Sequence, residues 1–139
     1  MKNLISDAKR LVIKIGSSLL VDSTTNTIHR AWLESLIEDV VQCCQRGQQV
    51  VIVSSGAIAL GRRHLQFKHR VLQLEEKQAA AAVGQIKLAH VYQEILAKHN
   101  IAVAQILLTL EDSENRKRYL NAKNTLETLL NFPLVKSAV

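Results

Sequence analysis

Two short segments of the chain combine residue types that bind anionic groups. In the first, the β-branched run 50–53 leads directly into Ser54, Ser55 and Gly56 and then into the helix-favouring stretch 57–60. This order is typical of a strand buried on both faces, a tight turn and a helix. Backbone N–H groups at a helix start lack partners within the helix, and the helix dipole favours negative charge there. The segment therefore predicts a carboxylate or phosphate site, although an ordinary N-cap has the same pattern.

The second segment repeats this design and adds a lysine. Residues 10–16, RLVIKIG, predict a first buried strand, and Ser17 follows Gly16. A lysine is costly to bury unpaired, so we expect Lys14 to emerge at the carboxyl end of the strand, where open α/β sheets bind ligands. Lys14 is thus a candidate for phosphate binding. The alternative is an edge lysine whose ammonium group extends to water.

The stretch between these segments predicts how they are positioned. Apolar residues recur at helical spacing at Leu33, Leu36, Ile37, Val40, Val41 and Cys44. Gly47 follows where a left-handed C-cap residue belongs. Strand, helix and strand form a βαβ unit, which makes the two strands parallel and places both Gly/Ser turns at one edge of the sheet. Lys14 and Ser55 are then expected to face one ligand.

Three further elements follow in the second half of the chain. Residues 77–100 have a helical pattern, in which Gly84 is expected to let another element pack closely. Residues 101–108, IAVAQILL, predict a third buried strand, and residues 116–130 predict a final helix. The tail 132–139 has the pattern of a strand beginning, which we expect to lack the partner that would complete a unit.

Composition narrows the class of protein. The chain has 139 residues, with 47% hydrophobic and 4% aromatic residues, which suits one domain with an aliphatic core. No apolar run approaches the roughly 18 residues of a membrane span, so we expect a cytoplasmic protein. Cys43 and Cys44 are neighbours on a helix, a spacing that suits neither a disulfide nor a metal pair, and we expect Cys44 in the core. No metal ligands are predicted.

The net charge of +6 indicates anionic partners without choosing among them. Basic residues cluster in the segments 62–70 and 116–123. Solvated surface is the simpler interpretation, and a contact loop for an anionic ligand is the alternative for the first cluster. Single-stranded nucleic acid is usually stacked on several aromatics, whereas only Phe67 and Tyr119 accompany these clusters. A nucleic-acid partner is therefore the weaker interpretation.

Five motifs, taken in order, resemble the glutamate 5-kinase family of the amino acid kinase superfamily. They are IKIGSSLL at 13–20, VIVSSGAIALG at 51–61, KQAAAAVGQ at 77–85, AQILLT at 104–109 and RYLNAKNTLETLL at 118–130. The resemblance implies an α/β fold, an αβα sandwich with a mainly parallel sheet that is incomplete at the carboxyl end. It implies that residues 1–139 form the amino-terminal part of the kinase domain, without the nucleotide-binding part and any carboxyl-terminal RNA-fold-like domain.

The resemblance also implies roles for particular residues. Lys14 corresponds to a catalytic lysine that contacts the ATP phosphates, beside Gly16 and Ser17. Ser55 corresponds to a serine that binds glutamate, beside Gly56 and Ala57. The family transfers a phosphoryl group from ATP, with Mg²⁺, to the side-chain carboxylate of glutamate, the first step of proline biosynthesis.

The family's further glutamate ligands and its nucleotide loop have no counterpart in this sequence, which predicts an inactive chain. If complete, the enzyme is expected to form a homo-oligomer. The alternatives are a noncatalytic remnant, a basic binding module, or the kinase half of a bifunctional pyrroline-5-carboxylate synthase.

Overall fold

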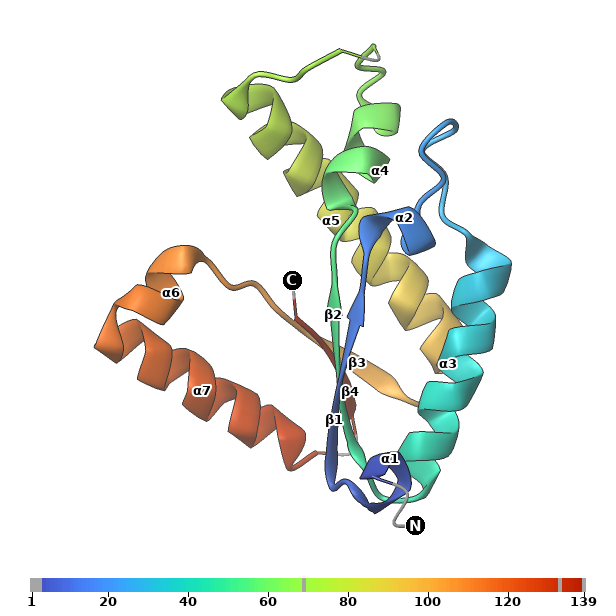
Figure 1. Ribbon diagram of the computed structural model, residues 1–139, viewed down its shortest axis with the longest axis vertical. Coiled ribbons are helices and arrows are strands. Elements are labelled where there is room, and N and C mark those ends of the chain that lie inside the picture. The colour runs from blue at the N-terminus through green and yellow to red at the C-terminus, as the bar shows by residue number, and fades with distance from the viewer. Residues whose placement is uncertain (1–3, 69, 133, 139) are drawn as a thin grey trace.

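A computed structural model describes residues 4–68, 70–132 and 134–138, which form one parallel sheet and its flanking helices (Figure 1). The strands are β1 (Arg10–Ile15), β2 (Gln49–Ser54), β3 (Ala102–Ile106) and β4 (Leu134–Ala138), in the order β1-β2-β4-β3. The helices are α1 (Leu4–Asp7), α2 (Ser17–Leu20), α3 (Arg30–Gln45), α4 (Ala57–His64), α5 (Leu74–Ala97), α6 (Leu110–Glu114) and α7 (Arg116–Leu130). The predicted α/β class with parallel strands is confirmed.

The first βαβ unit has the predicted arrangement. Strands β1 and β2 pair in parallel, with Ile15 opposite Ser54 at their carboxyl ends. Gly47 has a φ of 81°, as expected for a left-handed residue after α3. Both Gly/Ser turns therefore follow strands that end side by side at one edge of the sheet.

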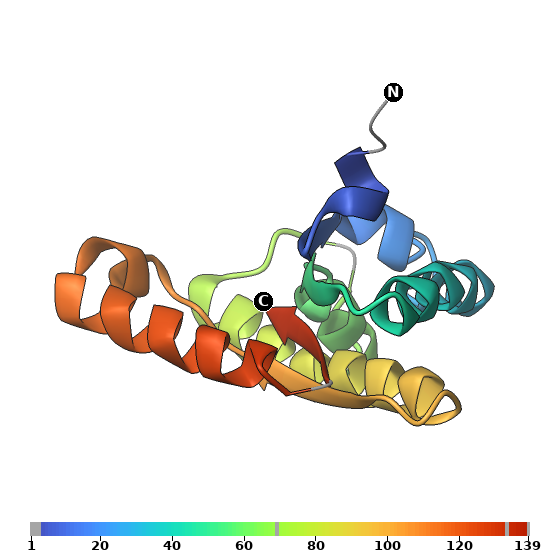
Figure 2. The same ribbon diagram turned by 90° about the horizontal axis from the view of Figure 1, so that it is seen from below.

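Strand β2 is covered on both faces, as its continuous apolar run predicted. Val50 and Ile52 belong to the main core, to which α3 and α5 contribute. Val51 and Val53 face the other way and pack with Leu126 and Leu130 of α7. Side chains alternate between the two faces of a strand, so two layers of helix are needed to bury all four valine and isoleucine side chains. Figure 2 shows α3 and α7 on opposite sides of the strands.

The predictions that the first and third strands are buried were wrong. β1 and β3 form the two edges of the sheet, and residues along β1 alternate between exposed and covered, with Val12 65% exposed. β3 is shorter than the predicted 101–108, and Leu107 and Leu108 after it are 64% and 43% exposed. Along β1 one face is covered and the face that carries Val12 and Lys14 is exposed. An apolar run does not reveal whether helices will cover both faces of a strand.

The tail strand also differs from the prediction. β4 lies inside the sheet, paired in parallel with β2 on one side and with β3 on the other. It therefore has both of its partners within this chain. The chain order of the strands differs from their order in the sheet because the last strand enters between two earlier ones.

Helices α4 and α5 pack through two glycines. A Cβ atom added to Gly84 would lie 1.6 Å from the carbonyl oxygen of Ala57, and one added to Gly61 would lie 1.7 Å from that of Ala80. Both distances are impossible for a real side chain, so the prediction that Gly84 admits another element is confirmed. Helix α4 and the start of α5 pack together beyond the carboxyl ends of β1 and β2, and α5 then continues back along the sheet (Figure 1).

Hydrogen bonds between neighbouring residues fix the start of α5. The helix begins at Leu74 instead of the predicted residue 77, because Gln73 and Glu76 form a capping box. The Arg70 guanidinium binds the Glu76 carboxylate, and Glu76 also accepts from the Gln73 backbone N–H. Arg70 first and Gln73 second lower the pKa of Glu76 to about 2.

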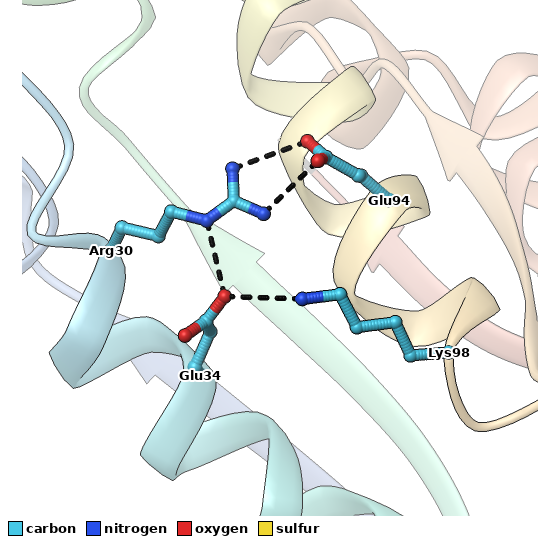
Figure 3. Close-up of polar contacts among 4 residues, drawn as sticks. All are labelled: Arg30, Glu34, Glu94 and Lys98. Atoms are coloured by element: carbon cyan, nitrogen blue, oxygen red, sulfur yellow. Dashed lines mark hydrogen bonds and ion pairs between the residues drawn. The ribbon is translucent and has the colours of Figure 1, made fainter.

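Four charged side chains join α3 to α5 on the outer surface (Figure 3). Arg30 Nε donates to Glu34 Oε1 at 3.1 Å, and Arg30 Nη1 donates to Glu94 Oε2 at 3.2 Å. Lys98 Nζ lies 3.5 Å from Glu34 Oε1. Hydrogen bonds from Arg30 are the first cause that lowers the pKa of both Glu34 and Glu94. This network links two helices that cover the same face of the sheet.

Candidate functional site

The turn after β2 requires a glycine. Gly56 precedes α4 with a φ of 115°, where L-residues are strained, and a Cβ there would lie 3.1 Å from Val21 Cγ2. In the described chain no side chain caps this helix start. The first N–H groups of α4 therefore remain available to an acceptor beyond the sheet edge, with the positive end of the helix dipole behind them.

The turn after β1 is built differently. Gly16 precedes the short helix α2 with a φ of −70°, and a Cβ there would meet no described atom within 4 Å. Neither backbone conformation nor packing within the described chain requires glycine at this position. The open space leaves the Gly16 backbone approachable by a ligand, and Ser17 beside it is exposed.

One open cavity of about 690 Å³ joins the two turns at the carboxyl edge of the sheet. Its lining includes four of the residues singled out from the sequence: Ser17, Ser55, Gly56 and Ala57. Ser55 is exposed and Ala57 is buried. The predicted shared edge is thus confirmed, and hydroxyls and free helix N–H groups meet in one place. These are groups that hold carboxylate or phosphate oxygens.

The structure places Lys14 and Gly16 outside the lining of this cavity. Lys14 is exposed, next to the buried Ile15, and its backbone lies opposite Val53 in the register. Successive side chains of a strand point to opposite faces, so Lys14 lies on the face opposite Ile15. Lys14 and Ser55 can therefore contact one ligand, as expected from the sequence, only if that ligand extends across the strand ends.

Other polar residues, which the sequence did not single out as site residues, also line the cavity. They are Ser18, Ser23, Asn26, Arg62 and Gln85, of which Arg62 belongs to the basic segment 62–70 that had ligand contact as its alternative interpretation. Helical spacing contained a signal for two of them. Arg62 follows Ile58 by four residues, and Gln85 follows Ala81 by four, so each shares a helix face with another lining residue.

Two hydroxyl groups are buried beneath the turn after β2. Ser54 Oγ and Tyr92 Oη have no hydrogen-bond partner among the described residues. Burial raises the pKa of Tyr92, and the nearby Ser54 hydroxyl opposes that change. The two hydroxyls thus influence each other without a hydrogen bond of ordinary geometry. Neither group carries a charge at neutral pH, and both lie below the cavity instead of lining it.

The described residues do not form a metal site. Within 4–68, 70–132 and 134–138 no three His, Cys, Asp or Glu side chains gather around a common point, and no carboxylate lines the described part of the cavity. The protein side chains at this edge do not fit Mg²⁺, which prefers carboxylate and phosphate oxygens.

Two further expectations concern the burial of Cys44 and the absence of a membrane-spanning helix. Cys43 and Cys44 form no disulfide within the described chain, and both are half-buried against the main core, so Cys44 is not more deeply buried than its neighbour. No described helix has the length and apolar character needed to cross a bilayer.

The basic clusters are partly neutralised. Arg70 pairs with Glu76, and Arg118 pairs with Glu111, both on the surface. These pairs support the interpretation of solvated surface for most of the cationic side chains. Arg62 differs, because it is half-buried and lines the cavity.

Comparison of the amino-acid sequence with those of known proteins identifies the family of this chain. The model of the amino acid kinase family matches residues 9–136. The chain is 61% identical over 131 residues to the glutamate 5-kinase of Paramagnetospirillum magneticum, covering 94% of this chain and 35% of that protein. It is 56% identical over 131 residues to the glutamate 5-kinase of a Ruegeria species, and 56% identical over 124 residues to that of Rhodospirillum rubrum. The chain spans about 35% of the length of such relatives, and on the family match it belongs to the amino acid kinase family.

Proposed function

We propose that this chain supplies the glutamate-binding part of a kinase that phosphorylates the side-chain carboxylate of glutamate. ATP is the donor and glutamyl 5-phosphate is the product, which makes this the first step of proline biosynthesis. The proposal rests on one observation: turns from two parallel strands line a single cavity at the carboxyl edge of the sheet. The similarity to glutamate 5-kinases supports the choice of substrate.

Glutamate is proposed to bind on the α4 side of the cavity. Ser55 supplies a hydroxyl, and the unsatisfied N–H groups near Gly56 and Ala57 supply donors aligned with the helix dipole. Hydrogen bonds to a charged acceptor contribute about 1.5–3 kcal/mol each. A carboxylate is held there without a buried countercharge at the turn itself.

The transferred phosphoryl group is proposed to lie at the β1 turn. Lys14 is an exposed cation at the strand end, the Gly16 backbone is open to approach, and Ser17 reaches into the cavity from the same turn. Because Lys14 and Ser17 lie on different sides of the strand end, the phosphate must extend over the edge. Lys14 then acts as the catalytic cation.

The reaction requires alignment more than acid–base chemistry. A glutamate carboxyl group has a solution pKa of about 4.3 and is already ionised at neutral pH. One carboxylate oxygen forms a bond to the γ-phosphorus of ATP, the bond from that phosphorus to the bridging oxygen breaks, and ADP leaves with the electron pair. Negative charge develops on the equatorial phosphoryl oxygens, where Lys14 and backbone N–H groups stabilise it.

A chimera tests this function. The chain replaces the matching segment of the P. magneticum glutamate 5-kinase, and ATP- and glutamate-dependent hydroxamate formation is measured beside the parent enzyme. We expect turnover within about tenfold of the parent, a difference of about 1.4 kcal/mol in the barrier. A folded chimera without glutamate-dependent turnover would contradict the proposal.

The isolated chain provides the complementary measurement. We expect no measurable kinase activity and at best weak glutamate binding, because the described residues offer no complete nucleotide site. Alignment of two reactants contributes roughly 7–11 kcal/mol to such a reaction, so its loss abolishes turnover. Activity of the isolated chain at the level of the chimera would show that this reasoning is wrong.

A further inference from the structure

We propose that Arg62, assisted by Gln85, binds the α-carboxylate of glutamate and makes the cavity selective for an amino acid with two carboxylates. The inference rests on the proposed function, since it concerns the same cavity. Gln85 was not among the residues expected to bind a ligand, and Arg62 lies in the basic segment 62–70, for which contact with an anionic ligand was only the alternative interpretation. Two observations carry the inference, one concerning the charge of Arg62 and the other concerning the amide of Gln85.

Arg62 lies on the face of α4 that borders the cavity. It follows Ile58 by four residues and Ala59 by three, and all three line the cavity. Long helical side chains lean toward the helix N-terminus, which here is the Ser55–Gly56 turn. Six residues of α-helix from Gly56 rise about 9 Å, so the Arg62 backbone lies at the far side of the cavity from the strand ends and its side chain extends back over the cavity.

Arg62 has no contacting carboxylate among the described residues. It forms no ion pair there, whereas Arg70 and Arg118 are both paired. Glu76 already binds Arg70, which is the main cause of its lowered pKa, and the charge of Arg62 helps to lower that pKa further. Arg62 is also the one charged side chain in the described lining of the cavity. A half-buried guanidinium without a contacting protein carboxylate is suited to a ligand carboxylate, which it binds through two parallel hydrogen bonds.

Gln85 faces the same cavity from α5. Its Nε2 group is buried and has no acceptor among the described residues. A buried donor without an acceptor is energetically unfavourable, and an acceptor on a ligand removes that cost. The terminal torsion of glutamine is soft, so the amide can turn toward a ligand oxygen. The amide and the guanidinium thus offer donors from two helices that Gly61 and Gly84 hold in fixed contact.

The two ends of glutamate are then distinguished by position. The side-chain carboxylate must lie near the β1 turn, where Lys14 and Ser17 are proposed to meet the phosphate. The α-carboxylate is directed to the opposite side, toward Arg62. Binding is therefore expected to fall when the α-carboxylate is removed, as in 4-aminobutyrate.

Nuclear magnetic resonance titration of the 139-residue chain, with ligand concentrations in the millimolar range, tests the inference. The probes are L-glutamate and 4-aminobutyrate, and the signals followed are the Gly56 and Ala57 amides, the Arg62 Nε–H and the Gln85 side-chain amide. Arg62→Gln is compared with Arg63→Gln, because Arg63 is the exposed neighbour on α4 and does not line the cavity. Dispersed spectra report that each variant is folded, and the wild-type side-chain signals give a readout independent of mutation.

We expect glutamate to shift all four signals and to bind at least tenfold more tightly than 4-aminobutyrate. Arg62→Gln should remove that preference, and Arg63→Gln should retain it. If glutamate shifts Gly56 and Ala57 while Arg62 is unmoved and the two variants bind alike, the inference is overturned and the proposed function stands. If no cavity signal responds to glutamate, the proposed glutamate site itself is overturned.

Discussion

One cavity lies at each end of the parallel sheet, and the two differ in the chemistry that the helices give them. The cavity at the carboxyl edge, of about 690 Å³, is bordered by the start of α4. The cavity at the opposite edge, of about 600 Å³, is bordered by the segments that follow α3, α5 and α7. Helix starts present N–H groups and positive potential, whereas helix ends present carbonyl groups and negative potential.

The side chains reinforce this difference. In the described lining, the carboxyl-edge cavity contains hydroxyls, the amides of Asn26 and Gln85 and the cation Arg62, whereas the amino-edge cavity contains the neutral amides Gln45, Gln48, Gln49, Asn100 and Asn131 beside His99. Cavities of similar size are therefore not equivalent for an anionic ligand. In a parallel α/β fold the strands all run one way and the helices between them run the opposite way, so helix starts such as that of α4 lie at the carboxyl edge and helix ends lie at the amino edge.

The largest effect is expected from Lys14 in the chimera. Lys14→Ala should lower kcat by about 10²–10³-fold with little change in the KM for glutamate, because the lysine meets charge that develops during transfer. Ser55→Ala should instead raise the KM for glutamate about tenfold. Lys9→Ala, an exposed lysine at the amino edge, is the control and should leave both constants unchanged. Equal effects of Lys9 and Lys14 on kcat would remove the distinction between the two edges.

The next effect concerns the wall of the carboxyl-edge cavity. Gly84→Ala should lower the free energy of unfolding by about 3 kcal/mol, since the added methyl group overlaps the backbone of Ala57. Gly16→Ala is the matched control, because its methyl group enters open space at a φ of −70° and should change stability little. Urea unfolding of both variants measures the two free energies of unfolding. A Gly84→Ala variant as stable as Gly16→Ala would show that α4 and α5 are not in fixed contact.

A third measurement separates backbone strain from ligand binding. Gly47 and Gly56 both have positive φ, of 81° and 115°, and lie at opposite edges. Each substitution by alanine should cost about 1–2 kcal/mol of stability. Gly56→Ala should cost more, because its Cβ also approaches Val21. Only Gly56→Ala should weaken glutamate binding in the resonance titration, and an equal loss in Gly47→Ala would contradict the assignment of the ligand to one edge.

The smallest effect is expected from Glu76 at the start of the cavity wall. Its folded-state pKa of about 2 lies below the ordinary 4.5, so its contribution is present above about pH 4.5 and is lost as pH falls toward 2. Glu76→Gln should be less stable than wild type at pH 7, and the difference should vanish near pH 2. Urea midpoints across this range measure it. A difference between the two proteins that is the same at pH 7 and at pH 2 would contradict the role of the Arg70–Glu76 pair.

Local sequence patterns were sufficient to predict the elements whose structure depends on residues close together in the chain. The run 50–53 correctly predicted a buried strand, because four consecutive β-branched residues suit a strand that is covered on both faces. The turn at Gly47 and the close contact at Gly84 were predicted from the intrinsic properties of glycine. The shared edge of the two Gly/Ser turns followed from the parallel pairing that a βαβ unit requires.

The sequence by itself thus determined the strand–turn–helix units and the edge of the sheet that their two Gly/Ser turns share. Only the tertiary structure decided that β1 and β3 are edge strands and that β4 enters between β2 and β3, because strand order depends on contacts between distant residues. The tertiary structure also separated Lys14 from the cavity and brought Arg62 and Gln85 into it. Residue types indicate which chemistry is available, whereas the packing of helices against the sheet decides which side chains meet.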